Sequence, residues 1–199
     1  MRSTGIKIVG LCTTASIGYG VVHDQVTACI CPEYFAVAHP PLCTTCSTTV
    51  LALLWGFVGT FWIGAVFGAV LARVASGGQQ RVPFRAISTR VGKLLAAMAA
   101  AATVVGSIGW LIAPHLALPD SLAGSIPANA KQAFFAVWFA HAASYTVGLL
   151  GAGLVTRGVW SQAGRSPGFR FTPDGPLGWA RVLVLLAILF AVVWVTVTG

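Results

Sequence analysis

Charged residues are scarce in this chain of 199 residues. Asp, Glu, Lys and Arg together make up 8% of it, whereas hydrophobic residues make up 57%. A water-soluble domain normally carries about a quarter charged residues, and intrinsic disorder requires low hydrophobicity. The composition therefore excludes a water-soluble globule and a disordered chain, and it indicates a protein embedded in the lipid bilayer.

Acidic residues are scarcer than basic ones, with 4 Asp and Glu against 12 Lys and Arg, which gives a net charge of +8. A nucleic-acid-binding protein gathers its basic residues on one soluble face. Here they lie in short segments between apolar runs. We therefore expect no nucleic-acid partner, and we interpret the basic residues as markers of membrane topology.

Long apolar runs dominate the rest of the sequence. A helix needs about 20 apolar residues to cross a bilayer core about 30 Å thick. The first candidate run ends on His23 and Asp24, which interrupt the apolar stretch of a cleaved signal peptide, so we expect that helix to be retained. The sequence predicts an all-α bundle of five transmembrane helices in a single membrane domain, residues 1–199. The predicted helices cover about residues 7–26, 50–71, 94–112, 133–155 and 179–197.

The basic residues also predict the orientation of this bundle. All of the Lys and Arg residues except Lys131 precede the first predicted helix or lie in the segments after the second and fourth. Because short cytoplasmic segments are enriched in Lys and Arg, the N-terminus is predicted to be cytoplasmic and the C-terminus outside. Residues 27–49 then form an outer loop. The expected location is the plasma membrane, the inner membrane in a bacterium, with that loop facing the periplasm or the outside.

Small residues mark the predicted contacts between helices. Gly64-x-x-x-Gly68 forms one small face in the second predicted helix, and Gly148, Gly151 and Gly153 form another in the fourth. Small residues allow helices to approach closely in lipid. We expect close packing within the bundle, with a homo-oligomer or a larger membrane complex as the alternative.

Ionisable side chains inside a membrane are costly and therefore indicate function by default. His141 lies near the middle of the fourth predicted helix and shares a face with Tyr145. The residue is either a buried structural histidine or one that binds a ligand or transfers a proton. His23 ends a polar stripe on the first predicted helix that includes Tyr19, and Asp24 follows it. That end could alternatively be an interfacial anchor.

The outer loop adds Glu33 and His39 to these residues. Two of the four acidic residues and two of the four histidines of the chain fall between His23 and His39. Imidazoles with carboxylates suit zinc, iron, copper or manganese, although no established metal-binding spacing is present. We predict a metal site with His23, His39, His141 and Glu33 as ligands. The candidate catalytic residues are Asp24, Glu33 and Tyr145.

The outer loop also holds four of the five cysteines, Cys29, Cys31, Cys43 and Cys46. Disulfides are expected in an oxidising compartment outside the cytoplasm. Because bridging within Cys-x-Cys is strained, we expect Cys29 or Cys31 to pair with Cys43 or Cys46. The Cys-x-x-Cys motif is alternatively redox-active.

Cys43-Thr44-Thr45-Cys46 just before the second predicted helix resembles the bacterial membrane disulfide-forming oxidoreductases, which pass electrons to quinone. The resemblance implies an extracytoplasmic thiol-disulfide oxidoreductase. It covers only this motif and its placement. That family has four helices and a second outer cysteine pair, whereas the second outer loop here contains no cysteine and no arginine closely follows the motif.

A second resemblance covers more of the sequence. Tyr19-Gly20-x-x-His23-Asp24-Gln25-Val26-Thr27, then Cys31-x-Glu33-Tyr34-Phe35 and His39-Pro40-Pro41, are similar to a group of uncharacterised bacterial multi-pass membrane proteins. His141-x-x-Ser144-Tyr145 is similar as well. The group has no established activity, but its motif includes the candidate ligands. Cys29, Cys43 and Cys46 fall outside the motif, which favours the His/carboxylate hypothesis over the thiol hypothesis.

The leading hypothesis is therefore a small membrane protein with an outer His/carboxylate site that binds a transition metal. In a stronger form of this hypothesis, the site is also catalytic. The alternatives are the thiol-disulfide oxidoreductase and a non-catalytic accessory subunit of a membrane complex. The lipid bilayer is the partner expected in every case.

Overall fold

The fold is taken from a computed structural model that describes residues 2–39 and 42–164. Every regular element within these ranges is helical. The predicted helix at 179–197 and the two prolines of the His-Pro-Pro motif lie outside the described residues. The prediction of an all-helical protein is confirmed for the described part of the chain.

Four long helices account for most of the structure. They are α1 (Arg2–Ile30), α3 (Thr48–Ser76), α4 (Phe84–Ile112) and α6 (Lys131–Ala163). All four are long and apolar enough to cross a membrane. Short elements connect them, namely α2 (Pro32–Ala36), α5 (Asp120–Ala123) and the 3-10 turns Ala113–His115 and Ala128–Ala130.

The four helices extend beyond the predicted apolar windows, and local capping sets both ends of α3. The Ser47 hydroxyl accepts a hydrogen bond from the amide of Val50 at the start of α3. Gly77 caps the end of α3, and Gly164 follows α6 with a positive φ of 71°. Glycine adopts this backbone conformation without a steric penalty. Hydropathy predicts the apolar length of a helix, whereas these three residues mark where α3 begins and where α3 and α6 end.

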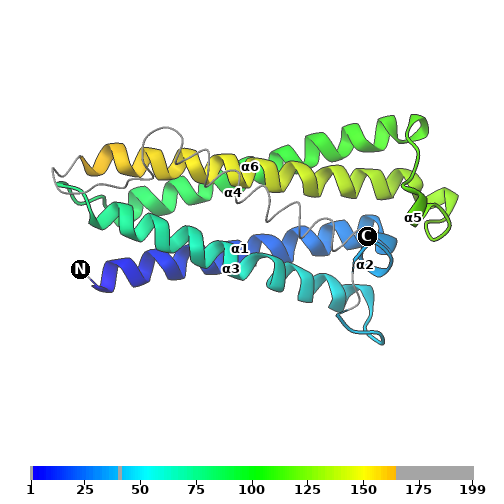
Figure 1. The fold of residues 1–199 in the computed structure, drawn as a ribbon, viewed down its shortest axis with the longest axis horizontal. Coiled ribbons are helices and arrows are strands. Elements are labelled where there is room, and N and C mark those ends of the chain that lie inside the picture. The colour runs from blue at the N-terminus through cyan, green and yellow to red at the C-terminus, as the bar shows by residue number, and fades with distance from the viewer. Residues whose placement is uncertain (1, 40–41, 165–199) are drawn as a thin grey trace.

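The bundle consists of two helical hairpins (Figure 1). α1 packs mainly on α3, and α4 packs mainly on α6. A Cβ atom added to Gly64 would lie 2.6 Å from the carbonyl oxygen of Cys12, and one added to Gly68 would lie 2.7 Å from Cα of Val9. The small face predicted in the second apolar window therefore packs on α1 within the same chain.

The two ends of the bundle have separate apolar cores. One core includes Ile8, Leu71, Ile87 and Val159. The other is built from aromatic residues such as Phe35 and Phe134 together with apolar residues of the segment between α4 and α6. α2 and α5 lie at this second end (Figure 1). The second core positions the residues of the candidate site.

Candidate metal centre

Three ionisable side chains converge between the two hairpins. His23 and Asp24 come from α1, and His141 comes from α6. Each contributes one ligand atom, and the three atoms all lie within 4.8 Å of one another. Asp24 and His141 are buried, and only 1% of His141 is exposed. Two imidazoles and one carboxylate are a donor set that binds zinc or iron in proteins.

The orientation of His141 is fixed by a hydrogen bond within its own helix. Its Nδ1 lies 2.9 Å from the carbonyl oxygen of Val137, which only accepts, so Nδ1 carries the proton. Its Nε2 lies 3.3 Å from Oδ1 of Asp24. Binding of one imidazole nitrogen to a carbonyl directs the other toward a metal ion. His141 therefore presents Nε2 to the cluster.

The spacing of these atoms fits a metal ion. Metal–ligand bonds of about 2.0–2.2 Å in tetrahedral geometry separate two ligand atoms by about 3.3 Å. The distance between Asp24 Oδ1 and His141 Nε2 has this value. All three ligand atoms lie within 4.8 Å of one another, so the three side chains could hold a metal ion.

His23 contributes an unpaired nitrogen to the site. Among the buried side-chain atoms of the described residues, its Nε2 is one of three without a hydrogen-bond partner. A buried polar atom without a partner costs about 1–3 kcal/mol, so it points to a missing ligand. The ring lies edge-on to His141, with 4.6 Å between ring centroids. Tyr19 stacks on its other side at 5.6 Å.

Aromatic residues of α2 cover the site. Cys31 occupies the N-cap position of α2 and Pro32 its first turn, which starts the short helix immediately after α1. Tyr34 and Phe35 are both buried, and the Tyr34 ring lies 4.7 Å from that of His141. α2 therefore shields His141 from water, which strengthens electrostatic interactions at the cluster.

His39 and Glu33 do not join the group of three ligand atoms. His39 Nδ1 is bonded to the carbonyl oxygen of Tyr34 at 2.9 Å, and its ring stacks on Phe35 and contacts Trp55. Burial lowers the pKa of the His39 imidazole and so favours its neutral form. Glu33 accepts a hydrogen bond from the Cys31 thiol at 3.4 Å. The structure gives both residues contacts that stabilise the fold of α2.

Tyr145 lies beside the cluster rather than in it. Its ring packs edge-on against His141 at 6.0 Å between centroids. Ser144 is buried, and its hydroxyl shares a hydrogen bond of 2.7 Å with Tyr19. That bond joins α1 to α6 one turn from the candidate ligands. Ser144 of α6 thus contacts Tyr19 of the polar stripe predicted on the first helix.

The predicted pairing of the outer cysteines is wrong. The disulfide joins Cys43 to Cys46, whose Cα atoms are 5.4 Å apart, whereas Cys29 and Cys31 are free. α1 continues to Ile30, so Cys29 lies on an exposed face of the helix. Cys31 is buried under α2, and burial raises the pKa of its thiol to about 12. Cys43 and Cys46 pack against the apolar core that contains Cys31, but neither of them is bonded to Cys31.

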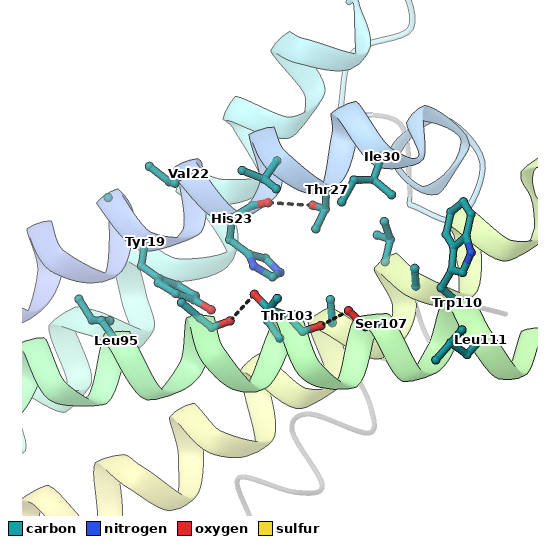
Figure 2. A pocket seen from close by; sticks show the side chains of 18 of the residues that line it. Tyr19, Val22, His23, Thr27, Ile30, Leu95, Thr103, Ser107, Trp110 and Leu111 are labelled. Carbon is teal, nitrogen blue, oxygen red and sulfur yellow. Dashed lines mark hydrogen bonds between the residues drawn. The ribbon is translucent and has the colours of Figure 1, made fainter.

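A cavity of about 870 Å³ lies beside His23, between α1, α4 and α6. Figure 2 shows His23 and Tyr19 projecting from α1 toward Thr103 and Ser107 of α4. Neither of these hydroxyl residues was predicted from the sequence to line a site. Their spacing of four residues in an alanine-rich helix places them on one face. This spacing is the sequence feature that could have predicted a polar face on α4.

No protein-family model, curated protein or solved structure matches this chain. The functional assignment therefore depends on the residues and their geometry.

Proposed function

We propose that this membrane protein binds one divalent transition metal ion through His23, Asp24 and His141. The observation that supports this proposal is the buried cluster, in which His141 Nε2 faces Asp24 and His23 Nε2 lacks a partner. Zinc and iron suit the donor set best, with copper and manganese as alternatives. Three protein ligands leave a position for an exogenous ligand, as catalytic metal sites do.

The proposed topology places this site near the outer surface of the membrane. The basic residues favour a cytoplasmic N-terminus, five spans and an outer C-terminus, in the plasma membrane or the bacterial inner membrane. α2 and the disulfide would then face the periplasm or the outside. We also propose that the chain belongs with the uncharacterised multi-pass proteins that its motifs resemble.

Elemental analysis by plasma mass spectrometry tests the metal site directly. The protein is purified in detergent without a metal-binding tag, and the metal content per chain is measured. We expect about one ion per chain for the three-ligand site. His23→Ala and His141→Ala should lose the ion because each removes a ligand.

The matched control is His115→Ala, because His115 is exposed and lies outside the cluster. It should retain the ion, as should His39→Ala if that variant folds. Equal metal content in all four variants would contradict the proposal. So would a stable, folded wild-type protein that binds no ion after incubation with zinc or ferrous iron.

The disulfide supports a second candidate function, an extracytoplasmic thiol-disulfide oxidoreductase. Cys43 and Cys46 are bonded within one Cys-x-x-Cys motif, as such enzymes require in their oxidised form. The test is a dithiol-exchange assay with wild type and Cys43→Ser. This function predicts that Cys43→Ser abolishes exchange and keeps the metal content unchanged. Equal rates in the two proteins would exclude it.

A further inference from the structure

The cavity beside His23 has an uncharged lining. Apart from His23, the described residues of the lining carry apolar side chains or hydroxyl groups, and none of them is Asp, Glu, Lys or Arg. In the metal-free protein, a charged head group buried there would have no compensating charge among these residues, which is energetically costly. A phosphate or carboxylate is therefore a poor ligand of the metal-free cavity, whereas an uncharged amphiphile fits. The cavity volume of about 870 Å³ is within the usual range for small-molecule sites.

The polar groups of the cavity favour a hydroxyl. Thr103 and Ser107 donate their own protons to carbonyl oxygens one turn earlier, at 2.9 and 2.8 Å. Their oxygen atoms still have lone pairs with which to accept a hydrogen bond. Among the polar groups of the lining, Nε2 of His23 is a buried nitrogen without a hydrogen-bond partner. A hydroxyl both donates and accepts, so in the metal-free protein it can bond to this nitrogen and to a neighbouring hydroxyl group. With the proposed ion bound to His23, the hydroxyl would contact the ion instead.

The length of the cavity fits one lipid chain. Its lining on α1 begins at Ala15, eight residues before His23, which corresponds to about 12 Å along the helix. One leaflet of the hydrocarbon core is about 15 Å thick. Leu95 lines the same end from α4, and Leu111 and Trp110 line the opposite end beyond His23 (Figure 2). A chain extending from His23 toward Ala15 would lie within the outer leaflet.

In the described part of the chain, the mouth of the cavity opens between α1 and α4. Val22 and Leu111 line the cavity and are 64% and 71% exposed. Both belong to helices that are long and apolar enough to cross a membrane. An apolar molecule dissolved in the bilayer can therefore enter sideways between α1 and α4 without passing through water.

From these features we propose that the cavity binds a long-chain alcohol, a lipid-soluble molecule with one apolar chain and a hydroxyl head. The head lies at His23 and Thr103, and the chain lies along α1 and α4. The inference extends the proposed function, because it assigns the substrate class of the same site. Binding itself requires the cavity, whereas any chemistry at the hydroxyl rests on the proposed metal ion.

Photo-crosslinking of purified protein in lipid nanodiscs tests this assignment. The probe is a long-chain alcohol with a diazirine in its chain, and labelled peptides are identified by mass spectrometry. Ala99→Phe fills the cavity from α4, whereas Ala100→Phe alters the next residue, which is exposed and does not line the cavity. We expect wild type and Ala100→Phe to be labelled on α1 and α4. Ala99→Phe should be labelled about tenfold less, equivalent to about 1.4 kcal/mol of binding free energy.

A second probe and the measured metal content distinguish failure of the alcohol site from failure of the metal site. In metal-free protein, the fatty acid with the same chain and diazirine should label the cavity more weakly at neutral pH because its carboxylate is charged. Equal labelling of both Phe variants, or preference of the metal-free protein for the acid, would overturn the assignment. If another protein segment fills the cavity, labelling stays at background in wild type, which also overturns it. Cavity labelling without bound metal would refute the metal site alone, and bound metal without labelling would refute the alcohol site alone.

Discussion

Replacing Gly64 with alanine tests the close contact between α1 and α3. The added Cβ would lie 2.6 Å from the Cys12 carbonyl oxygen and 2.7 Å from Cβ of Ser16. Ordinary contacts begin at 3.4 Å, so α1 must move away by about 0.8 Å, the difference between 3.4 and 2.6 Å. A backbone carbonyl cannot rotate aside as a flexible side chain can. Overpacking of this kind costs about 1–3 kcal/mol.

Gly59 is the matched control because it lies in the same helix and a Cβ there meets nothing within 4 Å. Gly59→Ala should be neutral or stabilising by up to about 1 kcal/mol, since alanine favours the helix. The assay is thermal unfolding in detergent, followed by circular dichroism. A shift of about 2–4 °C per kcal/mol predicts that Gly64→Ala lowers Tm by roughly 2–12 °C. Equal Tm values for the two variants would show that α1 and α3 do not meet at Gly64.

Two further predictions concern the outer end of the bundle. A membrane-impermeant maleimide added to intact cells or spheroplasts should label exposed Cys29 and spare Cys31, because Cys31 is buried and its thiol pKa is about 12. Strong labelling of Cys31 would contradict its burial, and labelling of Cys29 only after lysis would contradict the proposed orientation. The backbone amides of residues 31–39 should exchange faster as the pH falls below about 6.5, the pKa of histidine in the unfolded chain, after correction for intrinsic exchange rates. The exchange rate should continue to rise until the pH reaches the folded-state pKa of His39, which burial lowers. The asparagine in His39→Asn can still donate a hydrogen bond to the Tyr34 carbonyl but does not titrate, so this variant should lose the pH dependence of exchange. If the pH profile of His39→Asn matched that of wild type, His39 would not be the group that destabilises residues 31–39 at low pH.

Sequence reasoning located the long helices but not their ends. Apolar length is the property that lipid selects, so the windows at 50–71 and 133–155 fall inside α3 and α6. The extra turns contain polar or charged residues outside the apolar stretch, such as Lys131 at the start of α6. Hydropathy does not detect these turns. They depend on caps and on contacts with the neighbouring connections.

The candidate site was predictable only in part. His23 and His141 were predicted as ligands of one metal site because ionisable groups are costly to bury in a membrane, whereas Asp24 was predicted as a catalytic residue. His141 and Asp24 are separated by 117 positions, so only the packing of α6 on α1 brings them together. Glu33 and His39 were included because they lie near His23 in the sequence. α2 instead directs them toward Cys31 and Tyr34, a result that depends on a five-residue helix.

The position of the cluster between the two hairpins has a consequence for biogenesis. His23 and Asp24 belong to the hairpin that is synthesised earlier of the two, and His141 belongs to the later one. Each hairpin can enter the membrane with its own close helix contacts already formed. The ligand set is incomplete until α6 has been synthesised and inserted. Loading of the proposed ion would therefore follow insertion, and the ion would hold the two hairpins together as the last step of assembly.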